Sequence, residues 1–245
     1  MKSKAFWLPQ ILALACILAV GGVSMVYADA HGAGEEMEME MEEESGISGW
    51  FRTDTDSLGT QIWFGGSYPM GSVSIDSDIY VVGTFAEFDL GIGIPVVDDD
   101  SLSLTFLPMV GIGFDYATAN GPNSLIAPQL FTYLTAGSIS FESWIQMFFN
   151  TSFDYDDDLF YTRNFILYSV TDNIAIGPQL EVGATLAGLE EETETGLDSL
   201  VVGGRINMAY GENNTLGLFV GFETQLDEES EDSGITGRMT FVRTW

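Results

Sequence analysis

The chain has 245 residues, enough for one or two domains, and its 37 acidic residues outnumber 7 basic ones. A chain with a formal net charge of −30 repels phosphate backbones, which excludes nucleic acid as a partner. Because 46% of its residues are hydrophobic and 13% are aromatic, it is too apolar to be disordered throughout.

Residues 1–28 have the pattern of a secretory signal peptide. Lys2 and Lys4 precede an apolar run, and the small residues Ala28 and Ala30 follow it. Cleavage after either alanine fits the pattern, and a retained membrane anchor is the alternative. Cys16, the only cysteine, lies inside the apolar run, so the mature chain is expected to form no disulfide.

Residues 29–46 contain the run "EEMEMEMEEESG", which has many like charges and no core-forming pattern. This composition predicts an acidic disordered spacer. Binding of a soft metal ion by its methionines and glutamates is the alternative interpretation.

From about Gly59 onward, apolar and small or polar residues alternate with period two, which is typical of strands. In one such stretch Leu102 and Leu104 alternate with Ser103 and Thr105. The stretches are longer than the five or six residues usual in soluble sheets, and they suffice to cross a bilayer. No run of 18 apolar residues follows the signal peptide.

We expect about ten strands within a barrel domain of residues 47–245. They lie near residues 59–68, 78–96, 101–116, 125–136, 139–153, 159–170, 174–188, 197–210, 215–226 and 234–245. Eight or twelve strands are alternatives, because residues 47–56 resemble a further strand and residues 72–96 are long enough to divide. Short and long connections alternate, which predicts an all-β, antiparallel, up-and-down transmembrane β-barrel with both chain ends on the periplasmic side.

The chain ends with "GITGRMTFVRTW", an alternating stretch that runs to the last residue. In lipid, an unpaired sheet edge leaves backbone groups without partners at several kcal/mol each. The last strand is therefore expected to pair with the first one.

The signal peptide, the alternating strands and the ending "MTFVRTW" resemble those of Gram-negative outer-membrane β-barrel proteins of the porin type. The resemblance implies an outer-membrane location among its lipids, and a C-terminal signal that the barrel-assembly machinery reads. Trp245, Phe241 and Met239 match that signal, whereas Arg243 stands where an apolar residue is usual.

The polar faces of the strands predict a charged lumen. Glycines such as Gly83, Gly111 and Gly217 are expected to point inward and to leave room, whereas Phe219 and Trp144 are expected to fill it. The predicted ladder of inward charges consists of Glu181, Arg205, Glu223, Arg238, Glu87, Asp89 and Glu142. Buried charges need partners, so this ladder either holds the strands together or constricts a pore.

The predicted external loops are strongly acidic and are expected to concentrate cations, so a pore would prefer cations. Carboxylate oxygens also suit hard divalent cations. The candidate ligands are Asp156, Asp157, Asp158, Glu190, Glu191 and Glu192.

An enzymatic function is not expected, because His31 is the only histidine and lies in the predicted spacer. No cofactor is expected either. The sequence favours a small outer-membrane channel for ions or small solutes. The alternative is a non-conducting structural or surface-interaction barrel whose acidic loops bind divalent cations or a partner.

Overall fold

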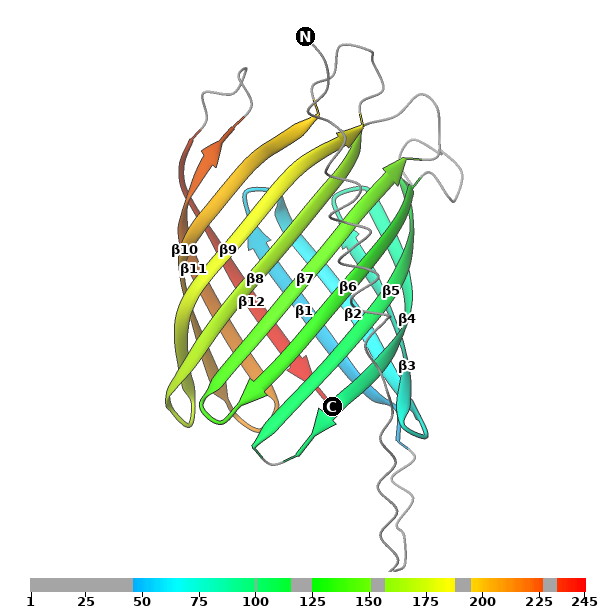
Figure 1. The fold of residues 1–245 in the computed structure, drawn as a ribbon, viewed down its shortest axis with the longest axis vertical. Helices are drawn as coiled ribbons and strands as arrows, with labels where there is room; N and C mark the ends of the chain where they lie inside the picture. Colours follow the sequence, from blue (N-terminus) through cyan, green and yellow to red (C-terminus); the bar gives the residue numbers. More distant parts are fainter. Residues whose placement is uncertain (1–45, 100, 116–124, 151–156, 188–194, 227–232) are drawn as a thin grey trace, which may run out of the picture. The chain divides into compact units, whose positions relative to one another are not determined.

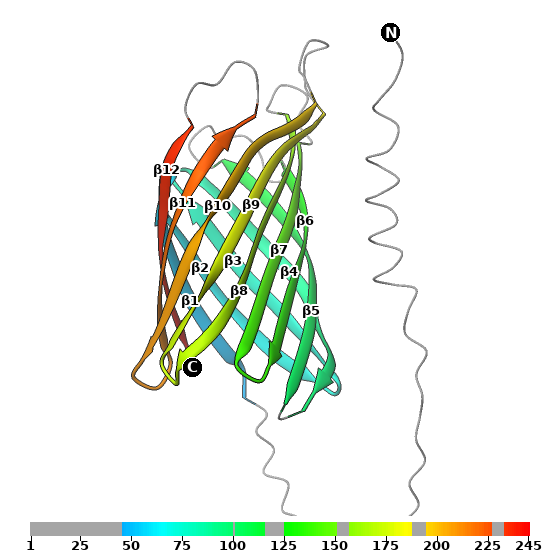
Figure 2. The ribbon, with the colours of Figure 1, turned by 60° about the vertical axis from the view of Figure 1, so that its left-hand side comes forward.

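The computed structural model describes residues 46–99, 101–115, 125–150, 157–187, 195–226 and 233–245, and these form one closed β-barrel (Figures 1 and 2). Its strands are β1 (Ser48–Asp56), β2 (Gly59–Met70), β3 (Val73–Val82), β4 (Phe85–Asp98), β5 (Leu102–Asp115), β6 (Leu125–Ala136), β7 (Ile139–Asn150), β8 (Asp158–Thr171), β9 (Ile174–Ala187), β10 (Gly196–Tyr210), β11 (Asn214–Gln225) and β12 (Gly234–Thr244). The predicted signal peptide and spacer, with Cys16 and His31, lie outside the described residues. No helix in this part of the chain is long and apolar enough to cross a membrane.

The barrel has twelve strands within these ranges, so the larger of the expected numbers is correct. Residues 47–56 do supply a strand, β1, and residues 72–96 divide into β3 and β4. The expected ranges leave residues 69–77 as a connection between two strands, which is wrong, since most of these residues belong to β2 and β3. Gly71 and Gly83 have φ values of 67° and 54°, the left-handed conformation that two-residue hairpin turns require. Gly83 is therefore a turn residue and not an inward strand glycine.

The seam between β1 and β12 closes the barrel. The backbone N–H of Trp245 donates to the carbonyl of Gly49 at 3.0 Å, and the N–H of Gly49 donates to the carbonyl of Trp245 at 2.9 Å. Antiparallel pairing continues along the seam, with Phe51 opposite Arg243 and Thr53 opposite Phe241. The predicted pairing of the last strand with the first is confirmed, with β1 as the first strand.

The two ends of the barrel differ. β1 begins and β12 ends at one end, where tight turns join β2 to β3, β4 to β5, β6 to β7, β8 to β9 and β10 to β11 (Figure 1). We call this the short-turn end. The four longest connections join β5–β6, β7–β8, β9–β10 and β11–β12 at the opposite, long-loop end. Both ends of the barrel segment therefore lie at the short-turn end, as an even number of strands requires.

The polarity of the barrel is inverted relative to that of a water-soluble protein. Large hydrophobic side chains such as Phe88, Val202 and Val220 are exposed on the outside, while charged side chains such as Asp54 and Arg163 are buried inside. Exposed apolar surface on this scale marks an interaction site, and an apolar band around a barrel suits lipid. The fold thus presents an apolar exterior and encloses a polar lumen.

Candidate functional site in the lumen

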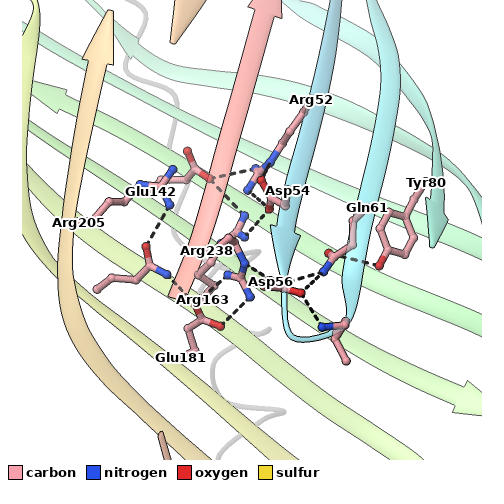
Figure 3. A network of polar contacts seen from close by, with 12 residues as sticks. Arg52, Asp54, Asp56, Gln61, Tyr80, Glu142, Arg163, Glu181, Arg205 and Arg238 are labelled. Atoms are coloured by element: carbon pink, nitrogen blue, oxygen red, sulfur yellow. Dashed lines mark hydrogen bonds and ion pairs between the residues drawn. The ribbon is translucent and has the colours of Figure 1, made fainter. Parts of the chain in front are cut away.

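Four charged residues, Arg52, Asp54, Glu142 and Arg163, form what we call the cross-lumen cluster (Figure 3). The carboxylate of Asp54 on β1 accepts hydrogen bonds from Arg52 Nη2 at 2.8 Å and from Arg163 Nη1 at 3.1 Å. Glu142 Oε1 lies 3.8 Å from Arg52 Nη1 and 4.0 Å from Arg163 Nη2. Glu142 lies on β7 and Arg163 on β8, on the opposite side of the ring from β1. These ion pairs therefore bridge the lumen from wall to wall.

Two members of the cross-lumen cluster, Asp54 and Arg163, are shielded from water. The side chains of Asp54 and Arg163 are 0% and 2% exposed. The guanidinium of Arg163 lies 5.2 Å from the ring centroid of Trp144, and that of Arg52 lies 5.1 Å from the ring centroid of Trp63. Both contacts are within the range of cation–π attraction, which is strongest when the cation is desolvated. Aromatic rings on β2 and β7 thus help to hold both arginines in place.

A second group, Asp56, Glu181 and Arg238, forms what we call the β12 cluster (Figure 3). Arg238 Nη1 donates to Glu181 Oε1 and Arg238 Nε donates to Asp56 Oδ2, both at 2.8 Å. Glu181 also accepts hydrogen bonds from the Tyr161 hydroxyl at 2.6 Å and from Gln179 Nε2 at 2.5 Å. One arginine of β12 therefore ties β9 to β1 across three intervening strands.

The predicted charge ladder is only partly formed. Glu181 and Arg238 do pair, but Arg205 and Glu223 join no ion pair among the described residues. Arg205 donates to Asn207 Oδ1 at 2.8 Å and to Gln179 Oε1 at 3.1 Å. The side chain of Arg205 therefore reaches amide groups instead of a partner in the predicted ladder.

Arg205 and Glu223 have neighbours of other kinds. The guanidinium of Arg205 lies 4.5 Å from the ring centroid of Phe165. It occupies space that a Cβ atom at Gly217 would need. The carboxylate of Glu223 accepts a hydrogen bond from Gln225 Nε2 at 2.9 Å.

Glu87 and Asp89 of β4 point inward as predicted, but their partners are amides. Gln146 Nε2 donates to Glu87 Oε1 at 2.9 Å, and Gln129 Nε2 donates to both carboxylates. A Cβ atom at Gly111 would overlap these carboxylates, so the predicted inward glycine does provide room. This carboxylate pair lies outside the two arginine clusters, whereas Glu142 belongs to one of them.

Four residues of the two clusters were missed from the sequence: Arg52, Asp54, Asp56 and Arg163. The spacing Arg-x-Asp-x-Asp places the three residues of β1 on one face of a strand. That signal was present, but residues 47–56 were not among the ten expected strands. Arg163 carried a signal of its own, as one of five arginines in the chain.

Among the described residues, one cavity lies on each side of these clusters. A cavity of about 310 Å³ in the half near the short-turn end is lined by Trp50, Tyr133 and Glu142, among others. One of about 150 Å³ in the other half is lined by residues that include Tyr161 and Glu223. The side chains at mid-depth are at most 6% exposed and come from several strands: Asp54, Glu87, Arg163, Gln179 and Arg205. In the described barrel, side chains therefore fill the middle of the lumen.

The predicted assembly residues share the outer face of the barrel. The ring of Trp245 covers Gly49, where a Cβ atom would overlap it, and its centroid lies 5.7 Å from that of Phe64. The rings of Phe241 and Phe51 are 6.3 Å apart. The C-terminal aromatic therefore packs across β1 onto β2.

The predicted divalent-cation ligands lie largely outside the described residues, namely Asp156, Glu190, Glu191 and Glu192. Of the other two, Asp158 Oδ1 accepts a hydrogen bond from the N–H of Asn150 at 2.9 Å, and the carbonyl of Asp157 accepts one from Asn150 Nδ2 at 2.8 Å. In the described ranges, no three His, Cys, Asp or Glu side chains are arranged to hold a metal ion.

Neither a protein-family model nor a curated protein matches the chain. Among solved structures, a BenF-like porin from Pseudomonas fluorescens Pf-5 superposes with a TM-score of 0.51 at 9% identity, covering 83% of this chain and 64% of the porin. OccAB3 of Acinetobacter baumannii gives a TM-score of 0.50 at 9% identity, covering 79% of this chain and 59% of OccAB3. The chain thus spans less than two thirds of the length of either protein. At this identity the likeness establishes the fold, which is that of outer-membrane porin barrels.

Proposed function

We propose that this chain is an outer-membrane channel of a Gram-negative bacterium that passes ions or small solutes with a preference for cations. The observation that carries the proposal is the bridging of opposite lumen walls by ion pairs, inside a barrel whose exterior is apolar. In channels, charged side chains at a narrow point select and limit what passes. The cross-lumen and β12 clusters are then the constriction, and the porin-like fold favours a channel over an enzyme.

The proposed cation preference rests on the charges that face the lumen. Four arginines contribute, namely Arg52, Arg163, Arg205 and Arg238. More carboxylates oppose them: Asp54, Asp56, Asp76, Asp78, Glu87, Asp89, Glu142, Glu181 and Glu223. A passage with an excess of one sign concentrates ions of the opposite sign and repels the others.

The proposed orientation places the short-turn end in the periplasm. Outer-membrane barrels have short periplasmic turns and longer external loops, and aromatic residues occur at both membrane interfaces. In this orientation both ends of the barrel segment are periplasmic, and Trp245 lies at the periplasmic interface where the assembly machinery would read it.

Planar-bilayer recordings test the proposed conduction. Refolded protein is expected to give stepwise currents, and a KCl gradient is expected to give a reversal potential on the cation-selective side, because carboxylates exceed arginines in the lumen. Protein-free detergent is the control. Loss of all stepwise current would contradict the channel proposal, and an anion-selective reversal potential would contradict the charge argument.

Replacing Arg238 by alanine tests the constriction. This change removes both ion pairs of the β12 cluster, and we expect a conductance at least about twofold larger with a stronger cation preference, since a bulky cation leaves the lumen. Arg243→Ala is a matched control, because Arg243 is exposed near the chain end on the same strand, on the face of Trp245. Equal conductance of Arg238→Ala and the unmodified protein would place the β12 cluster outside the permeation path.

The filled mid-lumen also supports the alternative of a non-conducting barrel that acts through its external loops. One measurement distinguishes the two functions. A non-conducting barrel would stay silent in the bilayer even after Arg238→Ala, whereas a constricted channel would not.

A further inference from the structure

The cavity near the short-turn end has aromatic faces on opposite walls. Tyr133 on β6 lines it and is 40% exposed, although its side chain points into the barrel. Trp50 lies on β1, across the ring, and its indole covers Gly65. Phe131 stacks on Trp144 with ring centroids 5.7 Å apart and an angle of 5° between the planes. A molecule in this cavity would therefore contact aromatic rings on two sides.

The polar lining of the same cavity is acidic. Glu142 and Asp76 both line it, and the side chain of Glu142 is 24% exposed. Tyr133 and Glu142 lie directly opposite each other on β6 and β7, so one wall offers a ring and a carboxylate together. Arg52 is the basic residue of the cavity lining, and it is already paired with Asp54 and Glu142. The carboxylates of the cavity lining therefore outnumber its arginine.

Two aromatic rings in this half of the lumen already contact the guanidinium groups of arginines. Arg52 lies over Trp63 and Arg163 lies over Trp144, at 5.1 and 5.2 Å from the ring centroids. The exposed ring of Tyr133 offers a ligand the same kind of contact. The cavity volume of about 310 Å³ is near the lower end of ligand pockets, roughly 300–1,000 Å³, which favours a small ligand.

We propose that this cavity binds a small organic cation of the alkylated ammonium class. Its cationic head lies against the ring of Tyr133, near the carboxylates of Glu142 and Asp76, and its alkyl groups contact Trp50. Aromatic rings recognise such cations through the ring quadrupole, and neighbouring carboxylates add charge attraction. Binding does not require conduction, so this site is tested independently of the proposed channel.

A matched pair of ligands tests the proposal. Choline carries a trimethylammonium group, and 3,3-dimethylbutan-1-ol is its uncharged carbon isostere. Isothermal titration into the refolded full barrel, in an uncharged detergent, is expected to give binding of choline at least about tenfold tighter than that of the alcohol. Equal affinities would show a merely apolar pocket and would overturn the proposal. The proposal would also be overturned if no binding of choline were detected up to tens of millimolar, roughly the weakest affinity of interest.

Variants locate the site. Tyr133→Leu keeps apolar bulk and removes the ring, and Asp76→Asn keeps the shape and removes the charge, so each is expected to weaken choline binding at least about threefold. Tyr168→Leu and Glu212→Gln are matched controls, because Tyr168 is exposed on the outer face and Glu212 is exposed in a tight turn of the same end. Heat-modifiable migration on a gel checks that each variant forms the barrel. Equal losses in the control variants, or no loss in the cavity variants, would overturn the proposed site.

Discussion

Replacing Asp54 by alanine is expected to lower the free energy of unfolding by about 3–5 kcal/mol, the cost of leaving a buried charge without its partner. Asp54 is fully buried, and it is the hydrogen-bond partner of both Arg52 and Arg163. The Nε and Nη2 atoms of Arg163 have no hydrogen-bond partner in the described part of the chain. Its guanidinium therefore depends on this one carboxylate for hydrogen bonding. Urea unfolding of the refolded barrel in detergent, followed by tryptophan fluorescence, measures the loss.

Two further variants separate the ion pair from the general effect of a substitution. Asp54→Leu combined with Arg163→Met removes both charges and is expected to be at least about 2 kcal/mol more stable than Asp54→Ala, because apolar pairs often replace buried ion pairs without loss. Glu212→Ala, in an exposed turn, is expected to change stability by no more than about 0.5 kcal/mol. A loss below about 1 kcal/mol for Asp54→Ala, the range of exposed ion pairs, would mean that water reaches Arg163.

The sequence predicts the barrel architecture more accurately than it predicts the bounds of the first four strands. From β5 onward the apolar face alternates cleanly, and the expected ranges agree with the structure to within a few residues. β1 was less visible because Thr53 and Thr55 occupy its outer face between charged residues. β3 and β4 were merged because the turn at residues 83–84 is flanked by apolar residues on both sides. A two-residue turn leaves little polar sequence to mark it.

The contacts within the lumen were harder to predict than the direction in which side chains point. Period-two alternation assigns Glu181, Arg205 and Arg238 to the inner face, and the structure agrees. Which of them meet depends on the tilt of the strands and on the barrel width, since both change with strand number. Two additional strands brought Asp56 within reach of Arg238 and placed Asp54 across the lumen from β8. Pairing across a closed barrel is therefore a property of the whole ring and not of neighbouring strands.

Removing the side chain of the last residue is expected to lower the yield of barrel assembled in the cell much more than it lowers the stability of the folded barrel. Trp245→Ala keeps both backbone hydrogen bonds to Gly49 and loses the ring that packs near Phe64. An exposed aromatic contact contributes about 0.5–1.5 kcal/mol, so the refolded variant is expected to unfold within about that margin of the original. If assembly machinery reads the terminal aromatic, the amount of folded barrel in the outer membrane should fall roughly tenfold, the ratio given by about 1.4 kcal/mol of lost recognition.

Tyr210→Ala is the matched control for this experiment. Tyr210 is an aromatic residue at the short-turn end, and its exposure of 50% is close to the 52% of Trp245. Unlike Trp245, it is not the last residue of the sequence. Its loss is expected to change unfolding by a similar amount and to leave the yield in the membrane unchanged. If the assembly machinery reads an aromatic ring and not an indole in particular, Trp245→Phe should restore the yield. If the yields of Trp245→Ala and Tyr210→Ala fell in parallel with their stabilities, Trp245 would act through barrel packing alone and would carry no assembly signal.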